Sequence, residues 1–137
     1  MKKTTKLAVS LIASTVLATT ASLFIDGIPI SGKPKSVNVK RVKIEHINYP
    51  NETKEFTDKK NIELTLALLS YLRTTPIKRP TDKPMVVKIT YDLTDGSRFT
   101  VEANKSSALI NGKYNTVHEK NTFVKMCTAA FFIKNEQ

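Results

Sequence analysis

The chain has 137 residues, of which 40% are hydrophobic and 25% charged, a composition typical of an ordinary globular protein. This length allows one domain, or one domain preceded by a targeting segment, and the single cysteine, Cys127, excludes an intramolecular disulfide. The formal net charge is +10 and the isoelectric point is near 9.8, which predicts attraction to an anionic wall polymer, an anionic membrane surface or nucleic acid.

Residues 1–25 predict a signal peptide or an uncleaved membrane anchor. Three lysines precede an uncharged run from residue 7 to residue 25, the order of segments in an export signal. The run is close to the ~20 apolar residues that span a bilayer, but serines and threonines dilute it, so cleavage is our first interpretation and anchoring the second. Both predict an exported protein, secreted or held on the outer face of the cytoplasmic membrane. Residues 26–35, which contain Gly and Pro and lack periodicity, predict a linker to a single domain over residues 36–134.

Residues 36–47 predict a strand that contains a bulge or bend. Its apolar positions alternate but change parity near residues 40–41. They are Val37, Val39, Val42 and Ile44, and His46 continues the alternation. A turn over residues 48–53 and a short return strand at residues 54–56 follow.

A helix is predicted to begin at an N-cap, Thr57 or Asp58, and to run to about Arg73. Its apolar positions form a stripe and a second group that widens it. The stripe is Ile62, Leu66, Leu69 and Leu72, and the widening group is Leu64, Leu68 and Tyr71. This arc is wider than one sheet face needs, so we expect cover from two directions, by a second helix or by self-association.

The segment 74–84 is predicted to be a stiff basic loop, because its three prolines prevent a helix from continuing. It carries Lys78, Arg79 and Lys83. Loops on rigid scaffolds commonly carry binding residues, so these three side chains are our candidate partner-binding site.

Two hairpins are predicted after this loop. In the first, alternating runs within residues 85–103 flank Asp95-Gly96, and in the second, residues 108–110 and 113–117 flank Asn111-Gly112. Both dipeptides favour tight hairpin turns because glycine tolerates a positive φ.

A closing helix is predicted after Asn121, which can act as its N-cap. One face of it is apolar, with Phe123, Val124, Met126, Cys127, Ala130, Phe131 and Ile133. This face could cover the wide arc of the first helix. The predicted class is therefore α+β: an antiparallel sheet, made of the N-terminal strand or strands plus a four-stranded meander, covered by two helices.

The sequence gives no motif for catalysis, metal binding or a cofactor. His46, His118 and Cys127 lack the spacing of metal ligands, and Cys127 lies in an apolar stripe, where a buried thiol is expected. No Gly-rich phosphate loop or nucleophile elbow occurs. We therefore expect a protein that is not an enzyme and uses no cofactor.

Several segments together resemble a family of small exported or membrane-anchored proteins of Gram-positive bacteria, a domain of unknown function. The resemblance spans residues 37–117 and is carried by five segments: VKRVKIEH, TDKKNIELTLALLSYL, PIKRPTDKP, ITYDLTDGSRFTVEA and NGKY. It implies export and this order of elements. No catalytic residue is carried over, and the chain lacks the lipid-attachment cysteine that many such proteins have after the signal.

The function predicted from these features is non-enzymatic binding outside the cytoplasm, to an anionic component of the cell envelope. The alternative is an accessory subunit that docks on a membrane protein or self-associates through the first helix. Export and the absence of interleaved basic and aromatic residues argue against nucleic acid as the partner.

Overall fold

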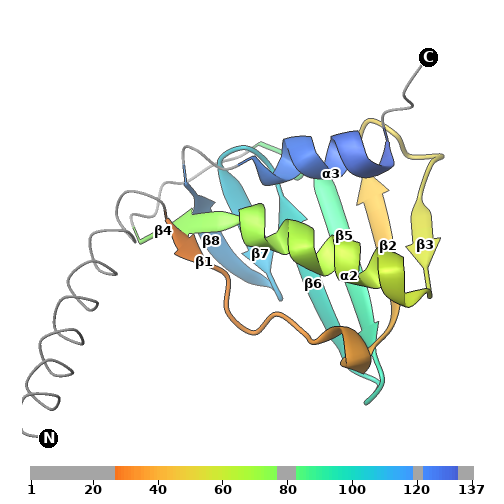
Figure 1. The fold of residues 1–137 in the computed structure, drawn as a ribbon. Helices are drawn as coiled ribbons and strands as arrows, with labels where there is room; N and C mark the ends of the chain where they lie inside the picture. The colour runs from red at the N-terminus through yellow and green to blue at the C-terminus, as the bar shows by residue number, and fades with distance from the viewer. Residues whose placement is uncertain (1–26, 77–82, 119–121, 133–137) are drawn as a thin grey trace, which may run out of the picture.

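The protein is described by a computed structural model over residues 27–76, 83–118 and 122–132. An eight-stranded antiparallel sheet with the strand order β1-β4-β8-β7-β6-β5-β2-β3 is accompanied by two α-helices. The strands are β1 (Ile28–Pro29), β2 (Val39–His46), β3 (Lys54–Phe56), β4 (Arg73–Thr75), β5 (Val87–Leu93), β6 (Arg98–Ala103), β7 (Ser107–Ile110) and β8 (Lys113–Val117). The helices are α2 (Lys59–Leu68) and α3 (Phe123–Phe131), with the 3-10 turns η1 (Ser36–Asn38) and η2 (Leu69–Tyr71). Figure 1 shows both helices on the same side of the sheet. The α+β class is confirmed.

Both hairpins form around the predicted turns. β5 and β6 pair from Val87↔Ala103 to Asp92↔Arg98, and Gly96 has a φ of +88°. β7 and β8 flank Asn111 and Gly112, which have φ values of 51° and 82°, as a type I′ turn requires. The bulge in β2 also forms, since the register with β5 shifts between Val39 and Arg41.

The core lies between the helices and one face of the sheet. Alternate residues of β2, β5 and β6 are buried together with residues of α2 and α3. The largest of these fully buried side chains are Tyr91, Phe123, Ile44, Leu69, Leu72 and Ile89. On the other face of the sheet, Asp92 on β5 accepts hydrogen bonds from Arg41 on β2 and Arg98 on β6, which joins three neighbouring strands.

The first helix begins where predicted but ends earlier. Asp58 is the N-cap and its carboxylate accepts a hydrogen bond from the backbone N–H of Asn61 at 3.0 Å. The helix was expected to reach Arg73, but Arg73 belongs to β4, which pairs with β8 and β1. Leu64 and Tyr71 are 43% and 47% exposed, so the wide apolar arc is only partly covered by the described residues.

Three further expectations differ from the structure. Val37 was placed in a strand but lies in η1 and is 75% exposed. Residues 26–35 were expected to be a linker, yet Ile28 and Pro29 form β1 at the edge of the sheet. This short strand is held by Arg73, which donates a hydrogen bond to the carbonyl of Gly27 at 3.0 Å. The N-cap of α3 is Thr122 rather than Asn121, which lies outside the described residues.

Candidate functional site

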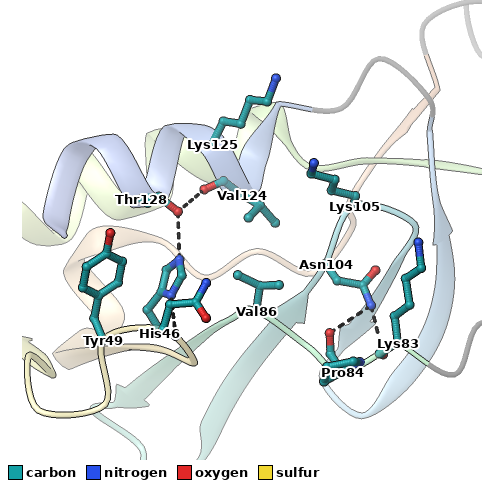
Figure 2. A pocket seen from close by; sticks show the side chains of 11 residues that line it. His46, Tyr49, Lys83, Pro84, Val86, Asn104, Lys105, Val124, Lys125 and Thr128 are labelled. Atoms are coloured by element: carbon teal, nitrogen blue, oxygen red, sulfur yellow. Dashed lines mark hydrogen bonds between the residues drawn. The ribbon is translucent and has the colours of Figure 1, made fainter. Parts of the chain in front are cut away.

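A cavity of about 550 Å³ lies at one end of the sheet, next to α3. Its lining comes from four segments: the end of β2 with the turn that follows, the segment before β5, the β6–β7 turn, and α3 (Figure 2). We call it the α3 cavity. A volume of this size is within the range of small-molecule sites.

His46 at the end of β2 forms one side of the α3 cavity together with Thr128 of α3. The Nδ1 atom of His46 accepts a hydrogen bond from the backbone N–H of Asn48 at 3.1 Å, so the ring proton is placed on Nε2. Nε2 then donates to the hydroxyl of Thr128 at 3.0 Å, and that hydroxyl donates to the carbonyl of Val124 at 2.8 Å. Both ring nitrogens are therefore engaged in the neutral form. Burial lowers the pKa of His46, which agrees with this assignment.

Aromatic rings pack around His46. The rings of Tyr49 and Phe132 lie 4.9 Å and 5.1 Å from it, centroid to centroid, and they stack on each other at 5.6 Å. Phe132 was not among the apolar residues expected on the closing helix, but it is buried. This packing fixes the imidazole between the turn after β2 and the end of α3.

Asn104 forms the opposite side of the cavity and is buried. Its side-chain oxygen accepts hydrogen bonds from the backbone N–H groups of Ser106 and Ser107, at 2.8 and 2.7 Å, which shapes the β6–β7 turn. Its amide nitrogen donates to the carbonyls of Lys83 and Pro84 at 3.2 and 3.3 Å. One buried side chain thus holds two lysine-bearing segments, at residues 83 and 105, next to each other (Figure 2).

Three lysines line the α3 cavity: Lys83, Lys105 and Lys125. Each comes from a different segment, and all three are exposed. None of the described residues that line the cavity is acidic. The described lining therefore carries three formal positive charges and no negative one. We call these three residues the lining lysines.

Apolar side chains lie between the two polar sides. Val86, which precedes β5, and Val124, in the first turn of α3, lie between the His46–Thr128 pair and Asn104 (Figure 2). Both are partly buried and pack against the hydrophobic core.

A second hollow of about 460 Å³ lies beside β1, β4 and β8. Lys113 is the one charged residue among the described residues that line it. It has no concentration of charge comparable to that of the α3 cavity.

Of the three residues singled out from the sequence, Lys83 lines the α3 cavity, while Lys78 and Arg79 lie outside the described residues. Lys105 and Lys125 were missed, because they are isolated lysines in the sequence and only the fold brings them near Lys83. His46 was placed at the end of the first strand and was judged to lack the spacing of a metal ligand, but it was not expected to line a cavity. One local pattern could have indicated Lys105: the turn that begins at Asn104 places this lysine at the tip of a loop.

Cys127 is fully buried, and burial raises the pKa of its thiol to about 12, so it stays protonated. Within residues 27–76, 83–118 and 122–132, no group of three potential metal-ligating side chains occurs. The same residues include no helix that is both long and apolar enough to cross a membrane.

Comparisons with known proteins give no match to a protein-family model, to a curated protein or to a solved structure. The family resemblance noted from the sequence therefore stays a prediction.

Proposed function

We propose that this protein is a non-enzymatic binding module that takes an anionic ligand in the α3 cavity. The observation that carries the proposal is the convergence of Lys83, Lys105 and Lys125 from three segments on a cavity whose described lining has no acidic residue. Like-signed charges lining a concave surface raise the local concentration of a ligand of opposite charge. The ligand is a component of the cell envelope in this proposal.

The location outside the cytoplasm is part of the same proposal. It is supported by the lysine-rich start and the uncharged run up to residue 25, and by the family resemblance. The finer arrangement expected from the sequence also belongs here: a β5–β8 meander covered by α2 and α3, which would serve as the rigid scaffold for the cavity. The strand pairings of β5 through β8 support it.

Binding of 8-anilinonaphthalene-1-sulfonate tests this proposal, because the compound joins an apolar ring system to one sulfonate and fluoresces when it enters an apolar site. The site variant changes the three lining lysines to Gln, and the control variant changes Lys35, Lys40 and Lys60, which are exposed and line neither the α3 cavity nor the second hollow. We expect affinity to fall about tenfold in the site variant, the effect of losing three modest ion pairs, and to stay unchanged in the control. Equal losses in both variants would mean that net charge, not this cavity, attracts the ligand.

A second candidate function, an accessory or self-associating subunit, is favoured by Leu64 and Tyr71. They lie seven residues apart, two helical turns along α2 and η2, and both are about half exposed. Sedimentation of the purified protein tests self-association. If the protein is a monomer at tens of micromolar, a concentration on the order of the dissociation constant of a weak dimer, this result argues against self-association.

A further inference from the structure

Three polar side chains that line the α3 cavity, those of His46, Thr128 and Asn104, are already hydrogen-bonded within the protein, and the polar side chains of Asn48 and Tyr49 line it as well. Both ring nitrogens of His46 are used, and the Thr128 hydroxyl accepts from His46 and donates to Val124. The side chain of Asn104 uses its oxygen on the β6–β7 turn and its nitrogen on the carbonyls of residues 83 and 84.

This arrangement restricts what can enter the cavity. Among the described lining, a sugar or another polyhydroxylated ligand would find polar partners, apart from the lining lysines, at Asn48 and Tyr49, and each hydroxyl group left without a partner costs free energy. An apolar group meets no such cost, because Val86, Val124 and the ring of Tyr49 offer it apolar surface.

The charge of the cavity lies at its solvent-exposed lysines. The methylene stem of a lysine can lie along apolar surface while its ammonium group stays in water. An anionic group of a ligand would therefore be held by the lining lysines, while the apolar part extends toward Val86 and Val124 (Figure 2).

We infer that the ligand of the α3 cavity is a single alkyl chain with one terminal anionic group, a carboxylate or a phosphate monoester. This inference rests on the proposed anion-binding function and names the ligand class. The volume of about 550 Å³ is within the range of sites that take small ligands. A free fatty acid and a single-chain phosphate ester share this chemistry.

The test is a calorimetric titration of the full chain with a series of ligands below their aggregation concentrations: acetate, hexanoate, octanoate, decanoate, decanol, decyl phosphate and inorganic phosphate. We expect each added pair of methylene groups to tighten binding of the carboxylates by about tenfold, as burial of these groups in an apolar site predicts. Decanol, which lacks the charge, should bind about tenfold more weakly than decanoate. Tighter binding of decanoate than of decyl phosphate would indicate a free fatty acid, and the reverse would indicate a single-chain phosphate ester.

The apolar part of the site is tested by Val86→Ser with Val124→Ser, and Val37→Ser, at a side chain 75% exposed and away from the cavity, is the matched control. We expect the double variant to weaken decanoate binding about tenfold and the control to leave it unchanged. If the double variant does not fold, the chain-length series in the wild-type protein decides the question.

The outcomes separate this inference from the proposed function. If acetate or inorganic phosphate binds as tightly as decanoate, and binding still depends on the lining lysines, the alkyl chain is wrong and the proposed function stands. If no anion binds, or if binding of decanoate is the same when the lining lysines are changed to Gln, both are overturned.

Discussion

The Nε2 atom of His46 lies 3.0 Å from the hydroxyl oxygen of Thr128, and this hydrogen bond joins the end of β2 to the middle of α3. The two residues are 82 positions apart in the chain. Because both also line the α3 cavity, the same contact that attaches the closing helix to the sheet shapes one side of the proposed binding site.

Thr128→Val should destabilise the protein, because valine keeps the shape of threonine but leaves the Nε2 proton of His46 without its acceptor. We expect the free energy of unfolding, measured with urea, to fall by about 1–3 kcal/mol. The control is Thr122→Val at the exposed start of the same helix, where the threonine side chain makes no capping hydrogen bond, and its effect should stay within about 0.5 kcal/mol. Comparable losses in the two variants would contradict the role assigned to the His46–Thr128 bond.

Stability should decrease as the pH is lowered through the ordinary pKa of histidine. Burial lowers the pKa of His46 below 6.5 in the folded protein, so between the two values the unfolded chain binds more protons. The free energy of unfolding therefore falls with pH from about 6.5 down to the folded-state pKa, by at most about 1.4 kcal/mol per pH unit for this one group. His46→Gln should flatten the profile of urea midpoints between about pH 7.5 and pH 5.5.

Three carboxylates with lowered pKa values titrate below the pH range of this test. Side-chain hydrogen bonds from Asn61, Arg41 and Ser97 lower the pKa values of Asp58, Asp92 and Asp95, respectively. Their stabilisation is fully present above the ordinary value of 3.8 and is lost as the pH falls below it, outside the histidine window. An unchanged profile in His46→Gln would show that another group causes the dependence.

Two substitutions of Asn104 should separate its role in the turn from its role in the cavity. Asn104→Ala removes both sets of hydrogen bonds and should lower the free energy of unfolding by about 2–4 kcal/mol. Asn104→Asp keeps an acceptor for the N–H groups of Ser106 and Ser107, so its loss should be smaller, although it gives up the bonds to residues 83 and 84. It also puts a negative charge beside the lining lysines and should weaken anion binding about tenfold. Undiminished binding in Asn104→Asp would argue that the ligand lies elsewhere.

Tyr91→Phe should leave stability unchanged or raise it. The hydroxyl of Tyr91 is buried, has no hydrogen-bond partner among the described residues, and has a raised pKa because of burial. Removing an unpaired buried hydroxyl relieves its desolvation cost, so we expect a gain of up to about 1 kcal/mol in urea unfolding. Tyr71→Phe, at a half-exposed side chain, is the control. A clear loss in Tyr91→Phe would show that the hydroxyl is hydrogen-bonded, with the side chain of Thr65 as the candidate partner.

The elements that could be predicted from the sequence are those set by local chemistry. Asp95-Gly96 and Asn111-Gly112 specify their turns without help from distant residues, and Asp58 caps its helix through a bond to Asn61, three positions on. β1 and β4 were missed because each has only two or three residues and gains its partners from far along the chain. The helical periodicity continues through Leu69 and Leu72, so the sequence predicted helix up to Arg73, where the structure has the start of β4.

The candidate site could be predicted only in part, for the same reason. Lys83 was noticed because it belongs to a local cluster of basic residues. Lys105 and Lys125 line the same cavity as Lys83 only after β6, β7 and α3 have packed, and no local pattern in the sequence indicates that arrangement. The hydrogen bond between His46 and Thr128 likewise could not be predicted, because a single sequence does not place the two residues beside each other.

Intermolecular NOEs between decanoate and the assigned methyl groups of the protein would locate an alkyl anion bound in the α3 cavity. We expect contacts from the chain methylenes to the methyl groups of Val86 and Val124. Contacts confined to Leu64 and Tyr71 on the first helix, or to Ile28 and Ile110 beside the second hollow, would contradict this expectation.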